Sequence, residues 1–110
     1  MMRVEEVRQR FNQIEQTIHQ ASQACERAGA GVPMDLKDSI QQLDQRSSQA
    51  RQELQQAQDE DAVIQCVDEL EELGDQAKAA CERGDNVDQQ LRQAVMQAHE
   101  ELRNLKHQLH

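Results

Sequence analysis

The chain has 110 residues, and its 21 Asp and Glu against 12 Lys and Arg give a formal net charge of -9 at pH 7. Gln, Glu, Ala, Leu and Arg are abundant, Phe11 is the one aromatic residue, and there are four Gly and one Pro. This composition favours helices and argues against a β-sheet, which draws on aromatic and β-branched residues and on frequent turns. The acidic balance argues against direct nucleic-acid binding, since phosphates are attracted by basic surfaces.

A single domain over residues 1–110 is expected from the length. The mean hydropathy of -0.95 with excess charge is typical of disordered chains. Here, however, the apolar residues recur at helical spacing along almost the whole sequence, which indicates helices with narrow buried faces.

A cytoplasmic protein is predicted from the start of the chain and from its cysteines. Residues 1–6 lead directly into a charged amphipathic pattern, without the apolar segment of a signal peptide, and no run of 18 apolar residues follows. Because no long apolar run is present, we expect no contact with a membrane. The three cysteines form no CxxC motif or disulfide framework, so we expect reduced thiols.

The first predicted helix covers residues 3–28. Its apolar side chains alternate at steps of three and four, the spacing of a heptad seam. Gly29 suits the left-handed position after a helix, and Pro33 cannot easily continue it. The seam residues are Val4, Val7, Phe11, Ile14, Ile18, Ala21, Cys25 and Ala28.

The second predicted helix covers residues 35–58, with the Asp35 carboxylate capping its first turn. The link of about five residues predicts that it runs antiparallel to the first helix. Its seam comprises Leu36, Ile40, Leu43, Ser47, Ala50, Leu54 and Ala57.

The acidic cluster at residues 59–61 interrupts this pattern, and the apolar seam that follows lies in a different register. Either the helix breaks here with Asp61 as a new N-cap, or it continues and turns another face inward. In the first case a third helix covers residues 62–83. Its apolar residues are Val63, Cys66, Val67, Leu70, Leu73, Ala77, Ala80 and Cys81.

The fourth predicted helix covers residues 87–109 and follows Gly84. Asn86 and Gln89 have the spacing of a capping box. Its seam comprises Val87, Leu91, Ala94, Val95, Ala98, Leu102, Leu105 and Leu109. The predicted fold is therefore an all-α, antiparallel up-down bundle of four helical segments with coiled-coil-like seams. The alternative has three helices, with one long central helix over residues 35–82.

Histidine patterns give no metal or catalytic site. None of the four histidines has a Glu three residues before it, as the diiron motif of helical bundles requires. His107 and His110 are three residues apart, but we interpret them as a solvent-facing helix end. Glu15, His19 and Ser22 share one helical stripe and the residue types of a hydrolase triad, but no Gly-rich turn accompanies them, so we interpret them as surface.

Glycine spacing also gives no cofactor site. The four glycines match neither GxGxxG nor GxxxxGK, so nucleotide binding has no support. Gly74, within the third predicted helix, is interpreted as a packing notch or a mild kink. The sequence thus predicts no catalytic residue, no cofactor, no metal site and no small-molecule ligand.

The cysteines lie on or beside the seams, where cysteine usually acts as a small apolar filler. The functional alternative is a thiol pair of Cys25 and Cys81, since each comes shortly before a glycine that ends its helix. In a closed bundle both thiols would lie at one end.

These features favour a non-enzymatic helical protein-protein interaction module, such as an adaptor, regulator or assembly factor. Its partner would be another protein or a second copy, and a homodimer is expected because seams rich in Ala, Ser and Cys give a thin monomer core. The alternatives are a thiol-based redox sensor through Cys25 and Cys81, and an acidic mimic that occupies a basic partner.

Overall fold

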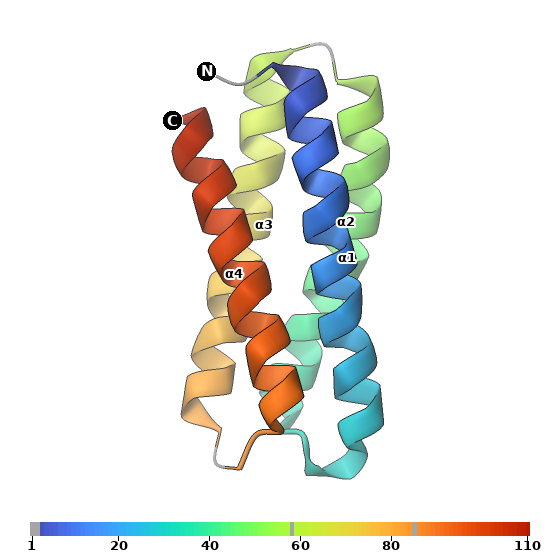
Figure 1. Cartoon of the computed structure of the whole chain (residues 1–110), viewed down its shortest axis with the longest axis vertical. Coiled ribbons are helices and arrows are strands. Elements are labelled where there is room, and N and C mark those ends of the chain that lie inside the picture. Colours follow the sequence, from blue (N-terminus) through green and yellow to red (C-terminus); the bar gives the residue numbers. More distant parts are fainter. Residues whose placement is uncertain (1–2, 58, 85) are drawn as a thin grey trace.

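The computed structural model describes residues 3–57, 59–84 and 86–110. In this part of the chain, four α-helices form an antiparallel bundle (Figure 1). The helices are α1 (Val4–Ala28), α2 (Met34–Gln56), α3 (Glu60–Arg83) and α4 (Gln89–Leu109), and a short 3-10 helix, η1 (Gly29–Gly31), follows α1. The predicted all-α, four-helix architecture is confirmed.

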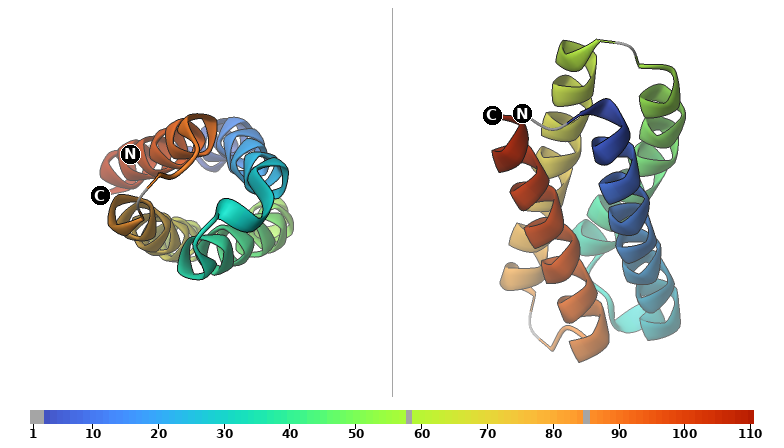
Figure 2. Two further views of the ribbon diagram at one scale, coloured as in Figure 1. Left: turned by 90° about the horizontal axis from the view of Figure 1, so that it is seen from below. Right: turned by 45° about the horizontal axis from the view of Figure 1, so that its top comes forward.

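The helices pack in a ring, α1 against α2, α2 against α3, α3 against α4, and α4 against α1. The view along the bundle shows this ring directly (Figure 2). Helices α1 and α3 therefore lie diagonally opposite each other. The start of α1, the α2–α3 connection and the end of α4 share one end of the bundle (Figure 1).

The helix breaks between α2 and α3, so the alternative with one long helix over residues 35–82 is wrong. The N-cap of α3 is Asp59, whose side chain accepts a hydrogen bond from the Asp61 backbone N–H at 3.0 Å. Asp61 was expected in that role, but it lies within the first turn. The predicted helix end at Gln58 lies outside the described residues.

Two other predicted helix starts also differ from the observed ones. Helix α2 begins at Met34 after Pro33, and the Asp35 carboxylate accepts from the Leu36 N–H from within the first turn. Helix α4 is capped by Asp88, which accepts from the Leu91 N–H, whereas Asn86 adopts the left-handed conformation with φ 59°. Gly29 has the positive φ, 66°, that its place after α1 suggested.

The predicted seams form the core in two clusters, one toward each end of the bundle. The cluster at the end with the chain termini holds most of the large side chains: Val7, Phe11, Ile14, Ile18, Leu43, Ala50, Leu54, Val63, Cys66, Val67, Leu70, Ala98, Leu102, Leu105 and Leu109. The cluster at the other end is richer in small residues: Ala21, Ala24, Cys25, Leu36, Ile40, Ala77, Ala80, Cys81, Leu91 and Val95. Predicted seam residues at helix ends, such as Val4 and Val87, are only half-buried.

Gly74 is a packing notch. A Cβ atom built on it would lie 3.2 Å from Leu102 Cδ1 and 3.8 Å from His99 Cα, both on α4. The missing side chain therefore lets α3 and α4 approach closely near the middle of their interface.

Candidate functional site

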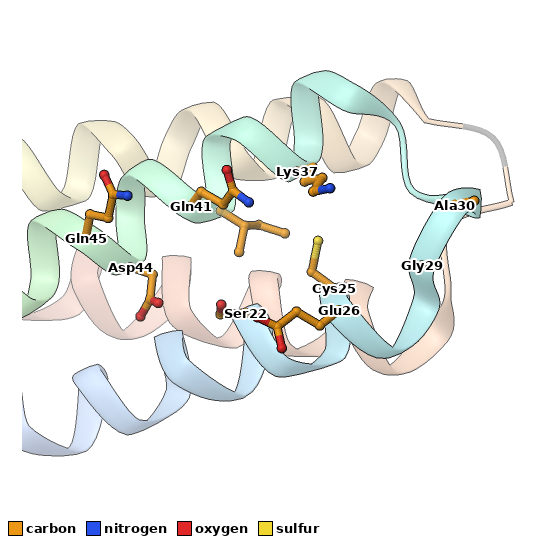
Figure 3. Close-up of a pocket in the computed structure, with 10 residues that line it drawn as sticks. Ser22, Cys25, Glu26, Gly29, Ala30, Lys37, Gln41, Asp44 and Gln45 are labelled. Atoms are coloured by element: carbon orange, nitrogen blue, oxygen red, sulfur yellow. The ribbon is translucent and has the colours of Figure 1, made fainter.

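A hollow of about 630 Å³ lies on the solvent side of the α1–α2 interface, toward the η1 end (Figure 3). Ile40 and Cys25 form its floor, because both lie on the buried seams. Polar residues that flank these seams form most of the walls. The lining comprises Ser22, Cys25, Glu26, Gly29, Ala30, Lys37, Ile40, Gln41, Asp44 and Gln45.

A second hollow of about 580 Å³ continues along the same two helices toward the other end of the bundle. It is lined by Asn12, Glu15, Gln16, His19, Arg51, Gln52 and Gln55. His19 of this hollow contacts Asp44 of the first one, with 2.9 Å between His19 Nδ1 and Asp44 Oδ1. We name the two hollows together the α1–α2 groove.

The stripe of Glu15, His19 and Ser22 lies in this groove, but its members have different surroundings. Glu15 is buried and faces Arg51 of α2 at 3.6 Å, so the interpretation of Glu15 as surface is wrong. His19 is exposed and pairs with Asp44, and Ser22 lines the first hollow. Glu15 and His19 are thus each directed to a partner on α2, which is the arrangement of a helix-helix contact.

Cys25 and Cys81 both lie in the core cluster of small residues, at the end of the bundle distant from the chain termini. They belong to the diagonal helices α1 and α3, and both thiols are free. Burial raises the pKa of the Cys25 thiol, against the lowering effect of Lys37, and burial likewise raises the pKa of Cys81, against Arg92. Neither thiol therefore has the lowered pKa of a reactive cysteine.

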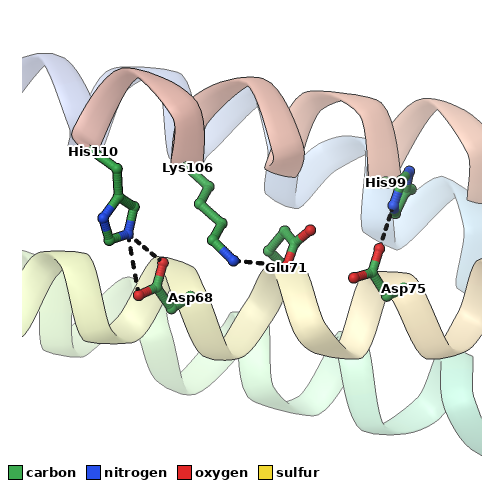
Figure 4. A network of polar contacts seen from close by, with 6 residues as sticks. All are labelled: Asp68, Glu71, Asp75, His99, Lys106 and His110. Atoms are coloured by element: carbon green, nitrogen blue, oxygen red, sulfur yellow. Dashed lines mark hydrogen bonds and ion pairs between the residues drawn. The ribbon is translucent and has the colours of Figure 1, made fainter.

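Three polar pairs cross the α3–α4 interface in a row (Figure 4). His110 Nε2 lies 2.9 Å from Asp68 Oδ1, Lys106 Nζ lies 3.4 Å from Glu71 Oε2, and His99 Nε2 contacts Asp75 Oδ1. His99 is 5 % exposed, which makes it the most buried member of the row. These cross-helix pairs were not predicted, because a pattern along one helix does not show what faces it.

His107 and His110 do not act together. His107 is exposed, and His110 reaches across to Asp68 on α3. His99 instead has two carboxylates close to it, those of Glu71 and Asp75 on α3.

The acidic run in residues 59–75, with eight acidic and no basic side chains, is partly paired within the bundle. Besides the three α3–α4 pairs, Glu69 contacts Arg46 of α2 at 2.8 Å. Four of the eight carboxylates thus have a cationic or imidazole partner on a neighbouring helix, which reduces the charge left for an acidic mimic.

No helix among the described residues is long and apolar enough to cross a membrane. Comparison with known proteins finds no matching family, no matching curated protein and no matching solved structure.

Proposed function

We propose that the chain is a non-enzymatic protein-protein interaction module of adaptor, regulator or assembly-factor type, which binds a polypeptide segment along the α1–α2 groove. The observation that carries the proposal is the groove itself, two polar hollows of about 630 and 580 Å³ in line on one pair of helices. Between Asn12 and Glu26 the groove follows α1 for about 21 Å, the length of about six residues of extended chain.

The lining favours a polar segment. Five glutamines, Gln16, Gln41, Gln45, Gln52 and Gln55, lie along the groove, and each side-chain amide both donates and accepts hydrogen bonds. Met34 is the one large hydrophobic side chain that is strongly exposed among the described residues, at 71 %. Binding would thus rely on hydrogen bonds from these amides rather than on a large apolar patch.

The proposal includes a cytoplasmic location, supported by three buried cysteines that remain thiols. The proposal also includes a homodimer, in which the partner is a second copy of the chain. A second copy would have to use a largely polar interface, and light scattering tests this against the monomer mass of 12.6 kDa.

Site-specific photo-crosslinking tests the groove. A photoreactive residue at Gln41 or Gln52, one in each hollow, should capture the same partner from cells, because one bound segment would touch both. The matched control is Gln93, an exposed glutamine on α4. Equal capture from Gln93 would overturn the assignment of the groove.

Salt dependence separates the proposal from the acidic mimic. A groove complex held by amide hydrogen bonds should persist as salt is raised, whereas a basic partner held on α3 should dissociate. Capture that is lost with salt, and that is reduced by Glu72→Gln on the exposed surface of α3, would support the mimic instead.

A further inference from the structure

Three side chains that can ligate a metal ion meet near the middle of the α3–α4 interface. Glu71 and Asp75 lie one turn apart on α3, and His99 faces them from α4 (Figure 4). One ligand atom of each residue lies within 4.8 Å of those of the other two.

The His99 ring is held in place by packing. It is almost fully buried, and a Cβ atom on Gly74 would lie 4.0 Å from its Cδ2 atom, so the ring lies against the glycine notch. Its Nε2 atom is directed at Asp75. An imidazole fixed in this way on one rigid helix, opposite two carboxylates on another, has the preorganisation that metal sites require.

The donor set suits a divalent transition-metal ion. Imidazole favours zinc, iron, copper or nickel over magnesium and calcium, and carboxylates complete such sites. The Asp75 side chain is 54 % exposed and that of Glu71 only 12 %, so the cluster is open to water on the Asp75 side. An ion can therefore enter, and water can fill its remaining coordination positions.

We propose that Glu71, Asp75 and His99 form a binding site for one divalent first-row transition-metal ion. The site lies between α3 and α4, whereas the groove lies between α1 and α2, so this proposal does not depend on the proposed function. The bound ion would link two helices and stabilise the bundle, because it binds the folded state.

Substitution of Lys106 should strengthen metal binding, whereas substitution of a ligand should weaken it. Its Nζ atom lies 3.4 Å from Glu71 Oε2, where its positive charge opposes that of an incoming cation. The amine has to move away when Glu71 turns to a metal. Lys106→Gln should therefore strengthen metal binding.

The same interface supplies a matched control. His110 and Asp68 also form a His-Asp pair between α4 and α3, but their side chains are 49 % and 38 % exposed. The cluster of potential ligands around His99 does not include them. A surface pair of this kind should contribute little to zinc binding.

Calorimetric titration of untagged protein with Zn²⁺, together with Co²⁺ absorption spectra, tests the site. We expect one ion per chain for the unmodified protein. His99→Gln and Asp75→Asn should each weaken binding by at least about tenfold, because even loss of an outer partner of a ligand has an effect of that size. His110→Gln should leave binding unchanged.

Circular dichroism shows whether each variant remains helical, and Asp75→Asn keeps the test valid if His99→Gln unfolds, since Asp75 is exposed. Absence of Zn²⁺ binding by the unmodified protein would overturn the proposal. Equal loss of binding in His110→Gln and Asp75→Asn would also overturn it, as would weaker binding by Lys106→Gln.

Discussion

The Arg8 guanidinium on α1 donates a hydrogen bond from Nε to the Leu54 carbonyl in the last turn of α2, at 2.6 Å. Its Nη2 atom also donates to the carbonyls of Gln55 and Ala57, at 2.9 and 3.3 Å. The last carbonyls of a helix have no partner within the helix. Arg8 thus caps α2 from another helix and fixes how the two helices meet.

Arg8→Ala should destabilise the bundle by about 1–3 kcal/mol, the usual range for loss of hydrogen bonds to a charged group. Arg10→Ala is the matched control, because Arg10 donates to one exposed partner, the Gln108 side chain. Urea denaturation followed by circular dichroism measures both. Equal losses for the two variants would show that the cap contributes nothing specific.

Gly74→Ala should lower stability, although alanine normally stabilises a helix by about 1 kcal/mol relative to glycine. The new Cβ would lie 3.2 Å from Leu102 Cδ1, so the Leu102 side chain, which is fully buried in the core, would have to shift. Thermal melting measures the loss of stability, which should be larger in Gly74→Val than in Gly74→Ala.

Gly31→Ala is the control for this substitution, since nothing lies within 4 Å of the corresponding Cβ position. It should leave the melting temperature unchanged or raise it slightly. A stabilised Gly74→Ala variant would contradict the close α3–α4 packing.

Burial raises the pKa of the Cys66 thiol from its ordinary value of 9.0 to about 11, with Arg46 lowering it and Glu53 raising it. A group with a raised folded-state pKa contributes stability that is fully present below its unfolded pKa and is lost as pH rises through the folded one. We therefore expect the free energy of unfolding to fall by about 2 kcal/mol between pH 9 and pH 11 because of this thiol.

Other groups also titrate in this range, so the prediction concerns a difference between two proteins. Cys66→Ala lacks the thiol and should show a smaller decrease in stability over the same pH interval. Parallel stability curves for the two proteins, measured by urea denaturation, would contradict the assignment.

Periodicity was sufficient to predict an all-helical chain and its buried faces, because burial of apolar seams decides this fold, but it left open whether the chain breaks near residues 59–61 or continues as one long helix. It failed at the helix starts, where neighbouring polar residues compete as caps. Asp59 caps α3 in place of Asp61, and Asp88 caps α4 in place of Asn86. Which residue does so depends on the path of the connection, and a capping pattern alone does not contain that path.

The polar contacts between helices could not be predicted from the sequence, for a different reason. His99 follows the seam residue Ala98, and its partners lie on α3, so finding them requires the rotation and register of both helices. One indication was available. Gly74 within a helix marked a close approach of another element, and both Asp75 and His99 lie beside that approach.

Cys25 and Cys81 provide the test of the redox-sensor alternative. They lie in one core cluster, but on the diagonal helices α1 and α3. With neighbouring helix axes about 8–10 Å apart, diagonal axes are about 11–14 Å apart. Because an inward-facing Cα atom lies about 2.3 Å from its helix axis, the two Cα atoms would be about 7–9 Å apart, at or just beyond the separation of about 7 Å that a disulfide allows. Burial also raises the pKa of both thiols, which keeps the attacking thiolate scarce.

We therefore expect that mild oxidation of a Cys66→Ser variant at low protein concentration gives no Cys25–Cys81 link in the folded state. Mass analysis of non-reduced peptides measures the link. Oxidation of the same variant in denaturant is the control, because there the chain can bring the two cysteines together and the bridge should form. A link that forms faster in the folded protein than in denaturant would contradict this expectation. It would show that the two thiols can meet within the bundle, which is what a redox sensor through Cys25 and Cys81 requires.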